Sequence, residues 1–219
     1  MAMLSQVSNK LKQNNIYHTI KDNFIITRKS KVLIQEVNGD LSYLIGVIAG
    51  DGTLIKTKRK KGGNHYVVKI YANSTNFLEQ LNRLFELNFK NSGKIIKDKR
   101  KQNTYLLEIP NASIYWYFEI LNTKYKDSNL PLFCTNKEFF NNYLAGLIDT
   151  DGSISCKRVQ LKLKDKGLIY KIYKKIKEAN PNEPKINYTK NLPYYYIRFD
   201  NLFPLRWKTN KFKNQEIPV

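Results

Sequence analysis

The segment YLAGLIDTDGS, Tyr143–Ser153, begins with apolar residues and ends in an Asp-Thr-Asp-Gly run. The segment YLIGVIAGDGT, Tyr43–Thr53, repeats this pattern upstream, with Gly46 at the place of Gly146. The tyrosine, the first leucine, the last aspartate and the glycine after it all recur at matching positions. An internal repeat of this kind predicts two related structural units on one chain.

The elements after each repeat are expected in the same order. After the first, the apolar patterns predict two strands, a helix, two strands and a closing helix, at residues 52–58, 65–73, 74–88, 93–99, 104–110 and 111–122. After the second, they predict a hairpin, a helix, two strands and a closing helix, at residues 152–165, 166–180, 184–190, 193–199 and 200–212. The predicted fold class is therefore α+β, with two α-β-β-α-β-β-α half-domains related by a pseudo-two-fold axis.

The chain is predicted to divide into four segments. They are an N-terminal extension, a first half-domain, a linker of turn formers and a second half-domain, at residues 1–40, 41–122, 123–136 and 137–219. In the extension we expect a short helix and a strand pair, at residues 4–13, 15–22 and 23–37.

The charge of the chain indicates a polyanionic partner. The 38 lysines and arginines outnumber the 18 aspartates and glutamates, which gives a formal charge of +20. A DNA duplex, with its dense phosphate charge, is the commonest such partner. A lysine-rich surface can also reflect codon usage that favours Asn, Ile and Tyr, and both explanations can hold together.

The cysteines and histidines argue against a soft-ligand metal site. Cys134 and Cys156 are too few for a disulfide framework or a zinc cluster, and His18 and His65 lie far apart. Any metal ion is therefore expected to have oxygen ligands. No apolar run reaches the roughly 18 residues of a spanning helix. We expect a soluble intracellular protein without membrane contact, in an archaeal cytoplasm or an organelle.

Alternation along the predicted strands separates a buried face from a basic face. In the second unit Val159, Leu161 and Leu163 are expected to point one way, while Arg158, Gln160, Lys162 and Lys164 point the other way. In the first unit Val68, Ile70 and Ala72 oppose Val67, Lys69, Tyr71 and Asn73. A twisted antiparallel ribbon with such a face can lie in the DNA major groove.

The repeated segments are predicted to be helices that pack against each other. Gly46 and Gly50 lie four residues apart, hence on one helix face, and Gly146 and Thr150 form the same face in the second repeat. Small residues at this spacing let two helix backbones approach closely. These four residues are the expected helix interface.

Gly52 and Gly152 are expected to end these helices in left-handed caps, which places Asp51 and Asp151 at the two helix C-termini. A carboxylate is disfavoured there by the helix dipole, and two neighbouring carboxylates repel each other. A divalent cation with oxygen ligands, Mg²⁺ above all, would offset both effects. The alternative is that both aspartates are simply solvated.

LIGVIAGDG (Leu44–Gly52) and LAGLIDTDG (Leu144–Gly152) resemble the two namesake motifs of single-chain LAGLIDADG homing endonucleases. The order of the following elements is similar too, so the resemblance extends from about residue 41 to the C-terminus. It implies a monomeric protein in which a saddle of two antiparallel sheets grips a long pseudo-palindromic DNA site. It also implies Mg²⁺-dependent hydrolysis of both strands, with Mn²⁺ or Ca²⁺ able to replace Mg²⁺ for binding.

The resemblance assigns the metal to the eighth residue of each motif, Asp51 and Asp151, with Gly50 and Thr150 beside them in the same site. Asp149 holds the sixth motif position, where the first repeat has Ala49, so it is not expected to be essential.

Family members carry a Lys, Arg or Gln near the end of the second strand of each unit, where it supports catalysis. Here the matching regions hold Asn73 and Lys164 as the catalytic candidates, with Lys69 and Arg198 as further ones. The full set of expected DNA contacts is Lys56, Lys58, Lys69, Tyr71, Asn73, Ser155, Lys157, Arg158, Gln160, Lys162, Lys164, Lys185 and Arg198.

Two other functions remain open from the sequence. An RNA maturase that assists splicing of its host intron is compatible with the basic faces and with the family. A DNA-binding regulator built on an inactive nuclease scaffold is the other, although such a protein would be expected to have lost one of the two aspartates.

Overall fold

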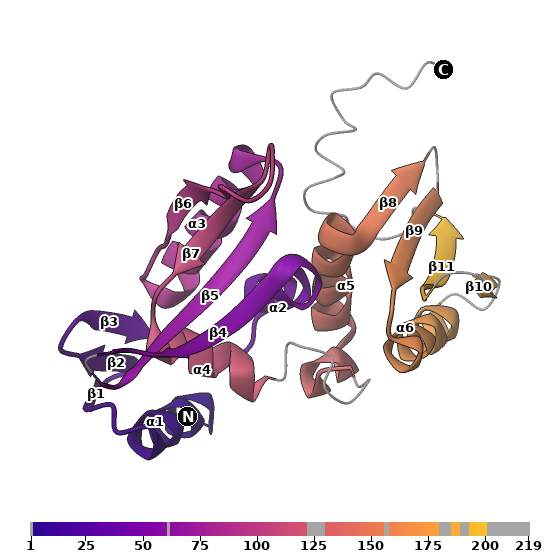
Figure 1. Ribbon diagram of the computed structural model, residues 1–219. Helices are drawn as coiled ribbons and strands as arrows, with labels where there is room; N and C mark the ends of the chain where they lie inside the picture. Colours follow the sequence, from indigo (N-terminus) through magenta and orange to yellow (C-terminus); the bar gives the residue numbers. More distant parts are fainter. Residues whose placement is uncertain are drawn as a thin grey trace.

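The computed structural model describes residues 2–60, 62–121, 130–155, 158–179, 185–188 and 193–200. The fold class is α+β, as predicted: two sheets of antiparallel strands flank a central pair of helices (Figure 1). No helix in these ranges combines the length and the apolar character needed to cross a bilayer.

The N-terminal extension differs from the prediction in its strands. Helix α1 (Ala2–Gln13) is followed by three short antiparallel strands, β1 (Thr19–Lys21), β2 (Phe24–Thr27) and β3 (Ser30–Leu33). The strand expected at 23–37 is broken because the Thr27 hydroxyl accepts hydrogen bonds from the amides of Lys29 and Ser30 and so stabilises a turn.

The first half-domain has the element order expected of it. Its helices are α2 (Gly39–Asp51), α3 (Thr75–Phe89) and α4 (Ala112–Ile120), and its strands are β4 (Gly52–Lys58), β5 (Asn64–Ala72), β6 (Lys94–Lys97) and β7 (Tyr105–Ile109). The strands form one sheet in the order β4-β5-β7-β6. The side chains of Asn38, Ser74 and Asn111 accept backbone N–H groups at the helix starts.

The second half-domain repeats this plan within the residues that are described. A short 3-10 helix, η1 (Leu132–Thr135), precedes α5 (Lys137–Asp151), β8 (Gly152–Ser155), β9 (Arg158–Leu163), α6 (Lys166–Ala179), β10 (Lys185–Tyr188) and β11 (Tyr195–Asp200). These strands form a sheet in the order β10-β11-β9-β8. Of the closing helix expected at 200–212, all residues after Asp200 lie outside the described part of the chain.

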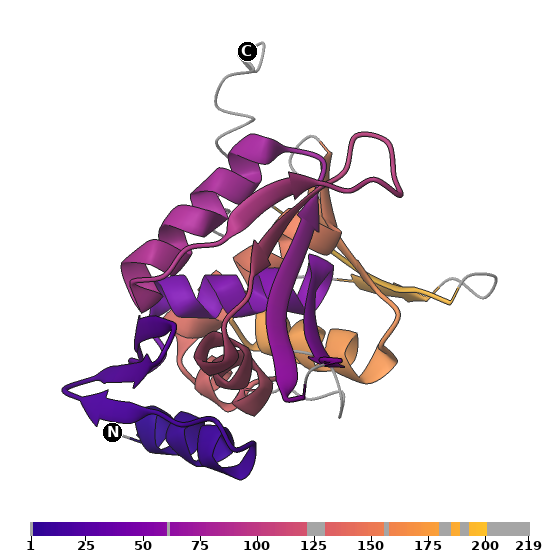
Figure 2. The same cartoon turned by 60° about the vertical axis from the view of Figure 1, so that its left-hand side comes forward.

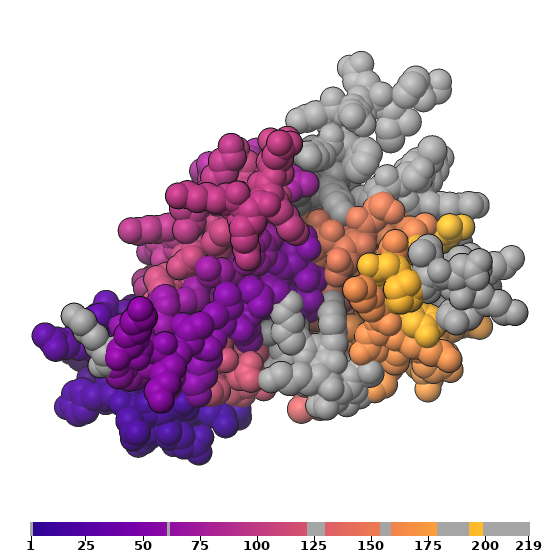
Figure 3. Space-filling model, viewed as in Figure 1, coloured from indigo at the N-terminus to yellow at the C-terminus, as the bar shows by residue number. Residues whose placement is uncertain are grey.

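Helices α2 and α5 lie side by side between the two sheets, and strands β4 and β8 leave their C-terminal ends (Figures 1 and 2). Helix α3 covers one face of the first sheet, and α6 packs against the second sheet at β11. The two half-domains meet along this helix pair. The space-filling view shows the two halves in contact (Figure 3). Both motif aspartates are therefore delivered to the middle of the molecule.

Cys134 lies in the core rather than in a reactive site. Its side chain is buried, and burial raises the pKa of its thiol to about 12. It therefore stays protonated at neutral pH. Cys156 lies outside the described residues.

Candidate active site and nucleic-acid interface

The two motif helices touch backbone to backbone where their glycines lie. A Cβ built on Gly46 would overlap the carbonyl oxygen of Tyr143, and a Cβ on Gly146 would overlap that of Tyr43. No larger residue fits at either position without moving a helix. Gly46 and Gly146 are thus the close-contact points of a nearly symmetric crossing.

The last turns of the two helices are also in contact, through the residues before the final aspartates. A Cβ on Gly50 would overlap the Thr150 hydroxyl and would lie 3.1 Å from Oδ2 of Asp151. The Thr150 hydroxyl points back along its own helix, donating to the carbonyls of Gly146 and Leu147 at 3.0 Å each. The carboxylate of Asp151 therefore lies against the residue that precedes Asp51.

Gly52 and Gly152 end the helices by a different mechanism from the one predicted. Both are extended, with φ of −89° and −91°, so the expected left-handed caps are wrong. A Cβ on Gly52 would lie 2.5 Å from Cα of Ile48, and one on Gly152 would lie 2.6 Å from the carbonyl oxygen of Ile148. Glycine is needed because the chain turns sharply from helix to strand against the preceding helical turn.

Asp149 has a structural partner across the helix crossing. The Tyr43 hydroxyl donates to Oδ2 of Asp149 at 2.8 Å, and this hydrogen bond is buried. Asp149 is only 8% exposed. A buried carboxylate needs such donors to offset its desolvation. Its hydrogen bond thus links α2 to α5.

The motif aspartates offer an oxygen-only site for a cation. Asp51 is exposed and Asp151 is partly buried, each in the last turn of its helix. In the part of the chain that is described, no group of three or more His, Cys, Asp or Glu side chains could hold a metal ion. Two carboxylates completed by water, backbone carbonyls and substrate phosphates are a common ligand set for small hard cations. The residues present fit such an ion.

Strand register shows that Asn73 and Lys164 occupy equivalent places. Gly52 pairs with Ile70 in the first sheet, and Gly152 pairs with Leu161 in the second. Asn73 lies three residues past Ile70, and Lys164 lies three residues past Leu161. Both side chains are exposed, on the sheet face opposite to the helices. The predicted support positions therefore flank the aspartates in matching ways.

The second sheet presents cations held by polar and aromatic neighbours. Nε of Arg198 donates to the Gln160 side-chain oxygen at 3.0 Å, across the β9–β11 pair. Nζ of Lys162 lies 4.1 Å from the ring centre of Tyr194, and Nζ of Lys164 lies 5.5 Å from it. These lysines are thereby held over a ring on the basic face.

For three other predicted DNA contacts of the second sheet, Ser155, Arg158 and Lys185, the backbone register alone gives their position. Ser155 pairs with Arg158 and Lys185 pairs with Arg198 in the strand register, which puts them on the face of Gln160. Lys157 lies outside the described residues.

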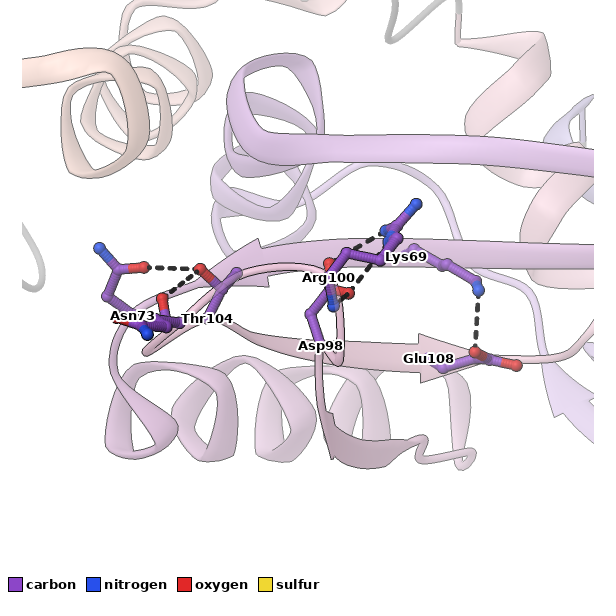
Figure 4. A network of polar contacts seen from close by, with 7 residues as sticks. Lys69, Asn73, Asp98, Arg100, Thr104 and Glu108 are labelled. Atoms are coloured by element: carbon purple, nitrogen blue, oxygen red, sulfur yellow. Dashed lines mark hydrogen bonds and ion pairs between the residues drawn. The ribbon is translucent and has the colours of Figure 1, made fainter.

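The first sheet is less basic on the equivalent face. Nζ of Lys69 forms a 3.0 Å salt bridge with Glu108 on the neighbouring strand, each side chain about one quarter exposed (Figure 4). The Thr104 hydroxyl donates to the side-chain oxygen of Asn73 at 3.4 Å. Val67, which was expected on the polar face, is 2% exposed. This face therefore combines an ion pair with a buried valine.

Lys56 does not lie on the sheet face that was predicted to contact DNA. It pairs with Tyr66, and its ammonium contacts the Asn14 side-chain oxygen at 3.0 Å and lies over the rings of Tyr66 and Trp116. This is the helix-covered side, because side chains alternate along a strand. Lys58, two residues on, shares its side, and the DNA contacts of both lysines stay predictions.

Several residues of these faces were not predicted. The rings of Tyr194 and Tyr196 contact the ammonium of Lys162, and Glu108 forms an ion pair with Lys69. Arg100 is fixed near the first sheet by Asp98. The alternation of Tyr196 and Arg198 with buried Ile197 could have indicated that Tyr196 lies on the basic face. The ion pairs depend on which strands are neighbours, which no single strand reveals.

Comparison with known proteins gives one family. Residues 38–122 match the protein-family model described as LAGLIDADG-like domain. The homing endonuclease I-DmoI of Desulfurococcus mucosus is 29% identical over 141 residues, covering 62% of this chain and 68% of that protein. An uncharacterised protein of Methanocaldococcus jannaschii is 24% identical over 146 residues, covering 66% of this chain. The chain spans about half, 52%, of that relative's length.

Solved structures of I-DmoI share the fold. Its complex with DNA and Mn has a TM-score of 0.59 at 24% identity, covering 83% of this chain and 97% of that one. Its complex with DNA and Ca has a TM-score of 0.61 at 23% identity, covering 80% and 97%. Residues 38–122 therefore form a LAGLIDADG-like domain, and the chain has the fold of I-DmoI with both repeated motifs on a single polypeptide.

Proposed function

We propose that this chain is a site-specific DNA endonuclease that hydrolyses both strands of a long, pseudo-palindromic duplex with Mg²⁺. One observation carries the proposal: the helix crossing at Gly46 and Gly146 brings the carboxylate of Asp151 against the residue before Asp51. Two acids at one place, between two exposed sheet faces, suit a reaction on a duplex held by those faces. DNA as the partner is further supported by the I-DmoI complexes.

The chain's own residues would divide the work. Asp51 and Asp151 would bind the cation from two sides and orient the attacking water. Lys164 would donate to the phosphate oxygens in one half, where charge develops during hydrolysis. Asn73, at the equivalent place, can donate through its amide but brings no charge. The bound cation would acidify water and stabilise the leaving oxygen.

The sheet faces would hold the duplex. Arg198 with Gln160, and Lys162 with its tyrosines, offer donors to base edges and phosphates along the second sheet. The first sheet offers Lys69 beside Tyr71. Because both half-domains are on one chain, a monomer would read two unequal half-sites. A long site of this kind suits an intron-homing role.

The first experiment selects a target and then cuts it. Duplexes that bind the protein in Ca²⁺ are enriched from a randomised library, and a labelled copy of the winning sequence is incubated with Mg²⁺. We expect both strands to be cut, and Asp51→Asn and Asp151→Asn to lose cleavage by about a thousandfold while binding in Ca²⁺ persists. Selective binding without cleavage would favour the regulator, and enrichment of intron RNA over duplex would favour the maturase. Full cleavage by either variant would show that the aspartates are misassigned.

A further inference from the structure

The loop that joins β6 to β7, residues 98–104, lies at the end of the first sheet where Asp51 lies. Lys97 pairs with Tyr105, and Tyr105 pairs in turn with Ala72, just before Asn73. Thr104, the last residue of the loop, contacts Asn73 directly. We call this segment the β6–β7 loop. Its position next to the motif aspartate follows from strand register alone.

Asp98 fixes the shape of the β6–β7 loop. Its amide donates to the carbonyl of Thr104 at 2.8 Å, and its Oδ1 accepts from the amide of Arg100 at 3.0 Å. Its side chain is only 5% exposed. A short polar side chain that binds the backbone two residues on is a common way to stabilise a turn. The loop therefore has a defined conformation.

The same carboxylate orients Arg100. Nε of Arg100 donates to Oδ1 and Nη2 donates to Oδ2 of Asp98, both at 3.0 Å, in a two-pronged ion pair (Figure 4). These hydrogen bonds lower the pKa of Asp98 to about 2. Yet the Arg100 side chain is 74% exposed. A guanidinium has five N–H groups, so the outer ones remain available to a further acceptor.

Arg100 also lies beside Tyr71, which marks its place relative to the active site. Its hydrogen bonds with Asp98, followed by its contact with Tyr71, raise the pKa of Arg100 above the ordinary value. Gly52, the residue after Asp51, pairs with Ile70, the residue before Tyr71. Partners in an antiparallel pair have Cα atoms about 5 Å apart. Arg100 therefore lies at the end of the first sheet where α2 ends in Asp51.

The second half-domain supplies a cation at this place from its own strand. Gly152, the residue after Asp151, pairs with Leu161, and Lys162 follows Leu161 as Tyr71 follows Ile70. The first half-domain has Tyr71 there, which carries no positive charge, and Arg100 comes from the loop instead. Lys97, Lys99 and Lys101 surround it, and residues 97–103 line an open hollow of about 600 Å³. The loop itself holds three cations and one acid, and Lys97 directly precedes it.

We propose that Arg100 binds a backbone phosphate of the duplex beside Asp51, and that Asp98 is the positioning residue that holds the guanidinium for it. The inference rests on the proposed DNA endonuclease function. It gives the first half-domain the positive charge that Lys162 gives the second. The loop becomes a phosphate-binding arm next to the cleavage site, in addition to the sheet faces.

The test uses the full-length protein and the selected duplex with each strand separately labelled. Cleavage of each strand is followed under single-turnover conditions for the unaltered protein, R100Q, R100K and D98N. R83Q is the matched control, because Arg83 is exposed on α3, away from the DNA-facing side. Binding in Ca²⁺ is measured over a range of salt concentrations, and thermal unfolding shows whether each variant is folded.

We expect R100Q to slow one strand about tenfold more than the other, because a charge-assisted hydrogen bond is lost in one half only. Lys162→Gln should slow the opposite strand. The salt slope of binding should fall by about one in R100Q and stay unchanged in R83Q. D98N separates positioning from charge: it makes the loop more positive, yet we expect it to cleave the affected strand several-fold more slowly. R100K should be intermediate.

Two outcomes would overturn the inference, and they differ. If R100Q and R83Q cleave both strands alike with equal salt slopes, Arg100 binds no phosphate while the proposed function stands. If the unaltered protein neither selects nor cuts a duplex, the proposed function fails and the inference fails with it. Faster cleavage by D98N would show that Asp98 restrains Arg100 rather than positioning it.

Discussion

The two half-domains share a scaffold but differ in the chemistry that they present. Their motif helices cross at matching glycines, Gly46 and Gly146, and their first strands start in matching register. The sheet faces opposite to the helices are not copies. At equivalent register positions the first sheet has the Lys69–Glu108 ion pair where the second has Gln160–Arg198.

This contrast follows from what each part must contact. The helix crossing is a self-packing surface, in which a change on one side clashes with the other. In the proposed complex the sheet faces would meet a separate molecule, so each could change independently. A chain of this kind is suited to a target whose two halves differ, because each face can read its own base pairs. In the proposal above, the first half takes its cation from Arg100 in a loop rather than from a strand.

The largest expected effect comes from the part that the halves share. Gly146→Leu should lower the free energy of unfolding by about 3 kcal/mol or more, because its side chain would overlap the Tyr43 carbonyl. Denaturant unfolding measures this change. Gly39→Ala is the control, since its new Cβ would meet the movable Asn142 side chain at 3.3 Å. Equal stability of the two variants would contradict the close crossing.

The hydrogen bond that breaks the symmetry of the crossing should have the next largest effect. Tyr43→Phe removes the donor to the buried Asp149 carboxylate, which should cost about 1–3 kcal/mol of unfolding free energy. Cleavage by the folded variant should persist, because Asp149 is assigned no role in chemistry. Tyr17→Phe, at an 85% exposed position, is the matched control. Loss of cleavage without loss of stability would instead place Asp149 in the reaction.

Asn73 and Lys164, the predicted support positions, offer a way to make the two half-domains alike in charge. Lys164→Asn should slow cleavage of one strand about tenfold, because a charged donor to the phosphate is lost. Asn73→Lys should speed cleavage of the other strand. Strand-resolved single-turnover cleavage measures both, with Lys174→Gln on the exposed face of α6 as control. Equal slowing of both strands by Lys164→Asn would show that the site is not divided in this way.

The smallest effect concerns the acid on the first sheet. Glu108→Gln releases Lys69 from its ion pair, so non-specific duplex binding should tighten a few-fold and its salt slope should rise by about one. Titration of a duplex without the selected site, at several salt concentrations, measures this. Glu79→Gln, on the exposed face of α3, should change neither quantity. An unchanged slope in Glu108→Gln would mean that Lys69 does not reach the phosphates.

The repeat and the strand alternation were enough to predict the α+β class and the element order. Glycine spacing also indicated the face on which the helices meet. Those features depend on neighbours along the chain. The left-handed caps were wrong because Gly52 is constrained by the carbonyl and Cα of Ile48 in the preceding turn, not by its own dihedral angles.

The candidate site was predictable only where it depends on single residues. Asp51 and Asp151 are specified by motif position, whereas the Asp149–Tyr43 hydrogen bond joins residues that are 106 positions apart. The side on which Lys56 lies could not be predicted, because a basic strand end gives no sign of which side a helix will cover. The Lys69–Glu108 pair requires knowing that β5 and β7 are neighbours.

We propose that Asp51 and Asp151 hold one cation site at the helix crossing, to which Asp149 does not contribute. Mn²⁺ bound to the complex with the selected duplex, measured by electron paramagnetic resonance against duplex alone, tests this directly. We expect Asp51→Asn and Asp151→Asn each to lose the protein-dependent Mn²⁺ signal, and folded Asp149→Asn to retain it. Full Mn²⁺ binding by both Asp51→Asn and Asp151→Asn would contradict the account.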